Sequence, residues 1–269
     1  MVSIANIALG IKLAWSARFW LLAGWLLILM VSFVVMAAQF SGRQPATLAL
    51  DVGLSFIRLS LAIFIALLVQ ELISKEFERR YYLYSLSYPF NRGELIFGRL
   101  IASFIIVNIV LVCAAFLLQV SVVVIEQGYA QSRPVSLGLS YWLTIGFLAV
   151  DLLVVTVVAI FLAVLAKTPG FVLIGTLGFT LVARSFSSIL ALLGGDNIVV
   201  DNPDQYQSSL SMVSLFLPDL GSLDVRQIAL YNDLSFLPST WPWTLTTVLV
   251  YVIVILSLTV WVFNRRRFN

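Results

Sequence analysis

The sequence predicts an all-α polytopic membrane protein with six transmembrane helices, and three observations lead to this fold class. First, 61% of the 269 residues are hydrophobic and 11% are charged, whereas an ordinary soluble domain carries about 25% charged residues. Second, six apolar segments of about 20 residues are long enough to cross the ~30 Å hydrocarbon core of a bilayer as helices. Third, Lys and Arg cluster at every second gap between these segments.

The predicted spans cover residues 19–38, 53–73, 100–125, 141–166, 171–193 and 243–263. They are expected to be helices because a backbone inside lipid must satisfy its own hydrogen bonds. With short loops they use nearly the whole length, so residues 1–269 are predicted to form a single transmembrane domain without an appended soluble catalytic domain. The first apolar run exceeds the core of a signal peptide and is expected to be retained.

The distribution of Lys and Arg predicts the orientation of the chain. One side of the spans holds eleven of them: Lys12, Arg18, Lys75, Arg79, Arg80, Arg92, Arg99, Lys167, Arg265, Arg266 and Arg267. The other side holds three, namely Arg43, Arg133 and Arg226. Because positively charged loops stay in the cytoplasm, both termini are predicted to be cytoplasmic. Placement of the basic residues at membrane ends also argues against nucleic acid as a partner.

The first 18 residues admit two interpretations. Ile4, Ile7, Ile11 and Trp15 recur at helical spacing, with Lys12 and Arg18 nearby. This pattern suits a short amphipathic helix lying flat on the cytoplasmic surface. The alternative is an early start to the first span.

The residue types available for chemistry are few. The chain has no His, so it lacks the commonest metal ligand and the usual general base near neutral pH. Its single cysteine, Cys113, lies in a predicted span and cannot form an intrachain disulfide. The sequence therefore predicts no catalytic, cofactor-binding or metal site in this chain.

The cytoplasmic segment 71–100 is the least membrane-like stretch of the first half. Ser74 is expected to cap a helix that Pro89 stops, and Asn91 to cap the next helix, which runs into the third span. The product is a helix–break–helix elbow projecting from the membrane. Its aromatic face and charged rim suit docking to a protein, and the alternative is a solvated connection without a partner. The aromatic residues are Tyr81, Tyr82, Tyr84, Tyr88 and Phe90.

This segment carries a family resemblance. It contains, in order, Phe77-Glu78-Arg79, Leu86, Pro89, Arg92, Leu95 and Gly98-Arg99, and it resembles the first cytoplasmic loop of ABC-2 type transporter permeases. The stretch Leu217 to Asp224 is similar to a Pro-Asp segment before the last span in some of these proteins. They have six spans, cytoplasmic termini and this size, so the resemblance covers essentially the whole chain.

The resemblance implies a permease subunit, most simply an exporter, in the bacterial cytoplasmic (inner) membrane. Two copies of this chain, or one copy and a homologue, would pair as a dimer with two ATPase subunits. The chain lacks a Gly-x-x-x-x-Gly-Lys-Ser/Thr phosphate loop, so ATP and Mg would be bound by the partner. The residues implied in ATPase coupling are Glu76, Phe77, Glu78, Arg79, Arg80, Tyr84, Leu86, Pro89, Arg92 and Arg99. Two alternatives are an ion-coupled carrier working alone and a membrane anchor for a soluble partner without an ATPase.

Three charged residues, Arg58, Asp151 and Arg184, fall inside predicted spans. A charge at a helix centre costs about 2.5–3.5 kcal/mol on insertion scales, so each needs a reason. Asp151 and Arg184 are predicted about 15 Å and 14 Å from the external side, so a pair is possible. Arg58 is predicted shallower, at about 8 Å, and able to snorkel outward. The pair either lines a translocation route or locks two spans together.

The external segment 194–242 carries six Asp and only Arg226 among basic residues. The Asp spacing lacks the pattern of a calcium loop, so a solvated acidic surface is predicted. Gln207–Phe216 and Leu223–Tyr231 are predicted as short amphipathic helices at the outer interface. A contact with an external partner is a further possibility for this segment.

Overall fold

The computed structural model describes residues 4–42, 44–74, 92–128, 137–166, 168–195 and 217–265, together with Val135. Within these ranges the chain is built from helices and the turns that connect them, and no strand occurs there. The elements are α1 Ile4–Ser16, α2 Phe19–Phe40, α3 Pro45–Val69, the π-helical turn η1 Gln70–Ser74, α6 Arg92–Gly128, α7 Leu139–Leu165, α8 Pro169–Gly195, α10 Arg226–Tyr231, the 3-10 turn η2 Leu234–Phe236 and α11 Trp241–Arg265.

Six helices of the described residues are long and apolar enough to cross a membrane: α2, α3 with η1, α6, α7, α8 and α11. This makes the chain an all-helical, multi-pass membrane protein, and the number and order of the spans agree with the sequence prediction. The main difference is that α3 begins at Pro45, well before the predicted start at residue 53. A proline is tolerated in the first helical turn because the N–H that it lacks would have no helical partner there.

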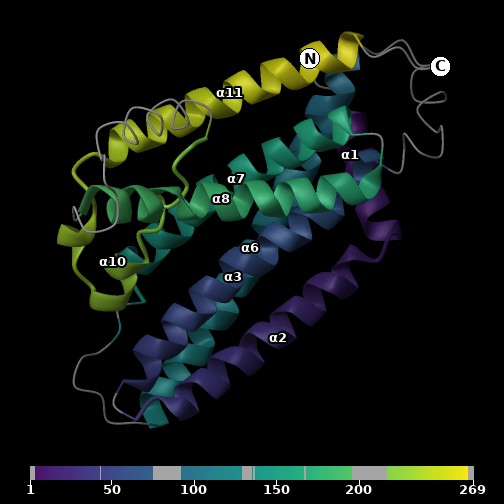
Figure 1. Ribbon diagram of the computed structural model, residues 1–269. Coiled ribbons are helices and arrows are strands. Elements are labelled where there is room, and N and C mark those ends of the chain that lie inside the picture. The colour runs from purple at the N-terminus through teal and green to yellow at the C-terminus, as the bar shows by residue number, and fades with distance from the viewer. Residues whose placement is uncertain are drawn as a thin grey trace.

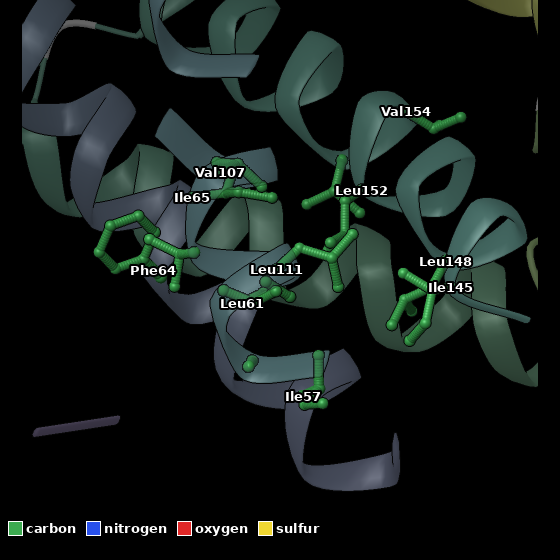
Figure 2. Close-up of a cluster of buried hydrophobic side chains, with 14 of the residues drawn as sticks. Ile57, Leu61, Phe64, Ile65, Val107, Leu111, Ile145, Leu148, Leu152 and Val154 are labelled. Atoms are coloured by element: carbon green, nitrogen blue, oxygen red, sulfur yellow. The ribbon is translucent and has the colours of Figure 1, made fainter. Parts of the chain in front are cut away.

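The centre of the bundle is formed by α3, α6 and α7 (Figure 1), which pack against one another. Figure 2 shows the apolar side chains at their junction, all of them buried. Those from α3 are Ile57, Leu61, Phe64 and Ile65, those from α6 are Val107 and Leu111, and those from α7 are Ile145, Leu148, Leu152 and Val154. Burial of this kind sets the relative positions of the three helices, on which the charged residues described below depend.

The outer helices expose large apolar side chains. In an apolar stretch of 18 residues, 22% of the residues of α2 and 17% of those of α11 are buried. The corresponding fractions are 61% in α3 and 67% in α7. Trp25, Phe33, Ile253 and Trp261 are among the exposed residues. Exposed apolar surface on this scale is unfavourable in water but suits contact with lipid or with another membrane helix.

The N-terminal helix α1 is separate from the first span. The break falls at Ala17 and Arg18, and Arg18 adopts a left-handed conformation with φ 60°. The helix packs on the beginning of α6 through small residues. A Cβ added to Gly98 would lie 2.7 Å from Asn6 Cβ, and one added to Gly10 would lie 2.7 Å from Ala102 Cβ. The predicted separate helix is therefore present, but its buried side is formed by Gly10 and Ala14, while Trp15 is exposed.

The region before α11 differs from its prediction. The helix expected over Leu223–Tyr231 is limited to α10, Arg226–Tyr231, and Ile228 and Ala229 are fully buried against α3 and α7. The segment therefore packs on the bundle through these two residues. The helix predicted over Gln207–Phe216 lies outside the described residues. The beginning of α1 and the end of α11 lie at the same end of the molecule (Figure 1).

The close approach of α1 and α6 leads to a stability prediction. Gly98→Ala places a methyl group against Asn6 and is expected to destabilise the protein by about 1–3 kcal/mol through overpacking. The control is Gly146→Ala in α7, where nothing lies within 4 Å of the added Cβ. There the better helix propensity of Ala is expected to stabilise the protein by about 0.5–1 kcal/mol. Thermal unfolding in detergent measures both, and equal shifts would contradict the proposed contact.

Candidate functional site

Six charged side chains form a continuous network that runs from the middle of three spans to the segment around the start of α10. They are three Asp and three Arg, so their formal charges cancel. We call them the charge network: Asp51 and Arg58 of α3, Asp151 of α7, Arg184 of α8, and Asp224 and Arg226 around the start of α10. Acidic and basic groups alternate along it, from the buried Asp151 outward to the half-exposed Asp51.

The innermost link joins α7 to α8. Arg184 Nη2 lies 2.5 Å from Asp151 Oδ2, and the Asp151 side chain is 1% exposed. Arg184 Nη1 also donates to the backbone carbonyl of Arg58 at 3.0 Å. The structure thus brings together the two residues that the sequence places at equal depth. Asp151 lies about 18 Å along α7 from its start and Arg184 about 17 Å along α8 from its end.

Arg58 joins this pair to the segment that follows α8. Its Nη1 lies 2.6 Å from Asp224 Oδ2, and its Nη2 donates to the Leu220 carbonyl at 2.6 Å. Its Nε lies 3.5 Å from Asp151 Oδ2. The prediction that Arg58 snorkels outward to water is wrong, because its guanidinium points to the carboxylates of Asp151 and Asp224. Because α3 begins at Pro45, Arg58 lies about 20 Å along the helix.

The outer part of the network is formed by Arg226. Its Nη2 lies 2.9 Å from Asp224 Oδ2 and its Nη1 2.9 Å from Asp51 Oδ1, and Nη1 also donates to Ser55 Oγ at 2.5 Å. Burial alone would lower the pKa of the Arg226 guanidinium, but the negative charges of Asp224 and Asp51 outweigh it and its pKa is raised. The Arg226 and Asp51 side chains are 36% and 41% exposed, so solvent screens this link.

Residues Leu217–Val225, which we call the strap, cover the network. Asp219 Oδ1 accepts hydrogen bonds from the N–H groups of Gly221 and Ser222, which shapes the turn after Pro218. The Leu220 N–H donates to the carbonyl of Ala183 in α8 at 3.2 Å. Leu220 and Leu223 are both buried. The strap is therefore attached by apolar contacts, by one backbone hydrogen bond, by the two Arg58 contacts and, through Arg226, by a link from Asp224 to Asp51 of α3.

A small cavity lies beneath the strap. It is lined by Leu54, Ser55, Arg58, Thr144, Leu148, Asp151 and the strap and α10 residues from Leu223 to Arg226, and it holds about 20 Å³, enough for a single water molecule. Asp151 Oδ1 is buried and accepts no hydrogen bond within the described part of the chain. The most buried carboxylate therefore retains an unused acceptor beside the cavity.

The network is suited to holding helices and less suited to proton or metal chemistry. Asp151 has two guanidinium groups within 3.5 Å, which balance its charge, and both Arg58 and Arg184 are tied to backbone carbonyls. Among the described residues, no three of His, Cys, Asp and Glu gather closely enough to hold a metal ion. Of the two roles predicted for the intramembrane charges, this geometry favours a lock between spans over a translocation route.

Most residues predicted to couple to an ATPase fall outside the described residues: Glu76, Phe77, Glu78, Arg79, Arg80, Tyr84, Leu86 and Pro89. Arg92 is the first residue of α6. Arg99 is 2% exposed, and its Nη1 lies 3.4 Å from the position of a Cβ on Gly10. The Arg99 side chain thus lies in the contact between α1 and α6 and is not available to touch a soluble partner directly.

The sequence interpretation missed Asp51, Asp224 and Arg226. Two signals point to them in retrospect. A charge as deep as Arg58 requires an acidic partner, and Arg226 is the single basic residue in a segment with six Asp. The chain was also compared with models of protein families and with curated proteins, and neither comparison finds a match.

The inner link leads to a prediction on stability. Asp151→Asn leaves Arg184 buried without its carboxylate and is expected to cost about 3–5 kcal/mol. The double variant Asp151→Asn with Arg184→Gln removes both charges and is expected to recover most of this loss. A double-mutant cycle from unfolding in detergent gives the coupling energy. Losses that simply add would show that the two side chains do not act as a pair.

Proposed function

We propose that this chain is the membrane permease subunit of an ABC-2 type transporter, most simply an exporter of the bacterial inner membrane. In this proposal a separate ATPase subunit binds ATP and Mg and hydrolyses ATP, and the chain couples that reaction to translocation. The proposal rests on the sequence motif of residues 71–100, which runs from η1 to the first turns of α6. The motif occurs in a chain with six helices long enough to span a membrane.

The packing at both ends of this connection supports a role in transmitting force. Leu72 and Ile73 of η1 are buried, and η1 contacts α1, α7 and α8. On the other side Ile96 of α6 is buried, and the first turns of α6 pack against α1. A push on the connection would therefore reach several helices, because close-packed interiors transmit displacement.

The mechanism we propose needs no chemistry within the chain. Closure of two ATPase subunits on ATP would push on the elbow between η1 and α6 and tilt α3 and α6. Two permease chains, identical or homologous, would then change which side of the membrane their shared interface opens to. The apolar surfaces of the spans favour a lipid-like or amphipathic cargo over an ion.

The charge network does not favour the alternative of an ion-coupled carrier. Such a carrier needs an ionisable group at membrane depth that gains and loses its ion during transport. Here the deep carboxylate, Asp151, is already neutralised by two arginines. The anchor without an ATPase is distinguished from the permease by the first experiment below.

Copurification tests the coupling. The complete chain, extracted in detergent, is expected to retain a partner that carries a phosphate-binding loop and hydrolyses ATP. Charge reversal of Glu76 and Glu78 to Lys is expected to lower the retained ATPase by about tenfold or more, because like charges across an interface cost several kcal/mol. Glu126→Lys, at the opposite end of α6, is the control and should retain the partner. A complex that forms without any nucleotide-binding partner would refute the proposal.

Labelling tests the orientation. With Cys113 replaced by Ala, single cysteines are placed at Tyr84 and at the exposed Ser235. A membrane-impermeant maleimide is expected to label Ser235→Cys in intact cells, but Tyr84→Cys only after permeabilisation, because the elbow is assigned to the cytoplasm. Labelling of Tyr84→Cys from outside alone would overturn the assignment.

A further inference from the structure

The strap is held to the bundle by a residue that has a second partner within reach. Arg58 contacts Asp224 and the Leu220 carbonyl at 2.6 Å, while its Nε is already 3.5 Å from Asp151 Oδ2. On the same carboxylate, Oδ1 is buried and accepts no hydrogen bond within the described residues. Arg58 therefore lies between two carboxylates, one on the strap and one on α7.

We propose that Arg58 is a two-position switch: paired with Asp224 it holds the strap closed over the cavity, and paired with both oxygens of Asp151 it releases the strap. This inference goes beyond the proposed function. It concerns the chain alone and does not require an ATPase or a particular cargo.

The alternation of charges makes the exchange possible without leaving a buried charge alone. When Arg58 leaves Asp224, that carboxylate keeps Arg226, whose Nη2 lies 2.9 Å from the same oxygen. Arg58 in turn gains Asp151, and a guanidinium can bind both oxygens of one carboxylate in parallel. A lone charge at this depth would cost far more than the exchange. The network thus provides a counter-charge for every group in both positions.

Release of the strap breaks the interactions that keep it closed at rest. They include the hydrogen bonds of Arg58 to Leu220 and of Leu220 to Ala183, and the burial of Leu220 and Leu223. The link from Asp224 through Arg226 to Asp51 of α3 stays in place. The carbonyl and the N–H of the strap would find water instead. Because Leu223, Asp224 and Val225 of the strap line the cavity together with residues of α3 and α7, release of the strap would open the cavity.

Arg184 provides the test, because it competes with Arg58 for Asp151. Arg184 Nη2 occupies Asp151 Oδ2 at 2.5 Å and Nη1 binds the Arg58 carbonyl, so its side chain is anchored on α7 and α3 and not on the strap. Arg184→Gln frees the carboxylate for Arg58 and is expected to open the strap. Adding Asp151→Asn removes the second position and is expected to close it again. The two variants share the change at Arg184 and differ only in the Asp151 carboxylate.

Strap opening is measured by labelling a single cysteine at Leu223, which is 3% exposed, with a maleimide. The protein carries Cys113→Ala and is held in lipid nanodiscs, where both faces are open to the reagent. Ser235→Cys, exposed and outside the network, is the control and should react equally in every variant. Asp224→Asn removes the anchor on the strap and is expected to react faster than the parent protein.

We expect the cysteine at position 223 to be labelled at least about tenfold faster in R184Q than in R184Q with D151N. A ratio of about this size corresponds to the loss of one charge-assisted hydrogen bond. The double variant should react no faster than the parent. Equal rates in these two variants, or a faster double variant, would overturn the switch. A rate difference that the unfolding stabilities of the two variants fully account for would also overturn it, because the loss of an ion pair alone then explains the result. An unchanged rate in D224N would overturn the role of Arg58 as the latch. If Arg184→Gln prevents folding, Arg184→Met is used in its place in both the single and the double variant.

Discussion

A charged side chain inside a membrane is costly without a partner of opposite charge, and this requirement organises the middle of α3, α7 and α8 around Asp151. Leaving such a charge alone costs about 2.5–3.5 kcal/mol on insertion scales. Asp151 of α7 meets Arg184 of α8 and Arg58 of α3, so three spans are held at one level. The apolar core between α3, α6 and α7 sets the distances between helices (Figure 2), and the charges set their register along the membrane normal.

The strength of the network decreases from the inside outward. Side-chain exposure rises from 1% at Asp151 to 14% at Arg58 and Arg184, 21% at Asp224 and 36% at Arg226. Buried ion pairs are costly to break, whereas exposed ones are worth about 0–1 kcal/mol. The bundle is thus joined by its strongest links and the strap by weaker ones. In the proposed switch, the strap separates from the bundle while the spans stay together.

The sequence predicted the spans well because their length and apolarity depend on local composition. It also placed Asp151 and Arg184 at one depth, since depth follows from the rise of a helix. It did not predict the link of Arg58 to Asp224, which joins residues 166 positions apart and depends on how the strap folds back. The burial of Arg99 was missed for a related reason: an arginine near a span end is ordinarily solvated, and here the small residues Gly10 and Gly98 let α1 approach α6 and cover it.

One helix connects the two ends of the proposed mechanism. At its C-terminal end α3 continues into η1 and the segment proposed for ATPase coupling. Its first half carries Asp51 and Ser55, and Arg58 lies at its middle. Arg58 Nη1 lies 2.6 Å from Asp224 and Nε 3.5 Å from Asp151, so both carboxylates lie within reach of the same guanidinium. Shifts of about 1–2 Å are usual when packed helices move against one another. In the proposed mechanism, a tilt of α3 driven from the elbow would move Arg58 between its two partners.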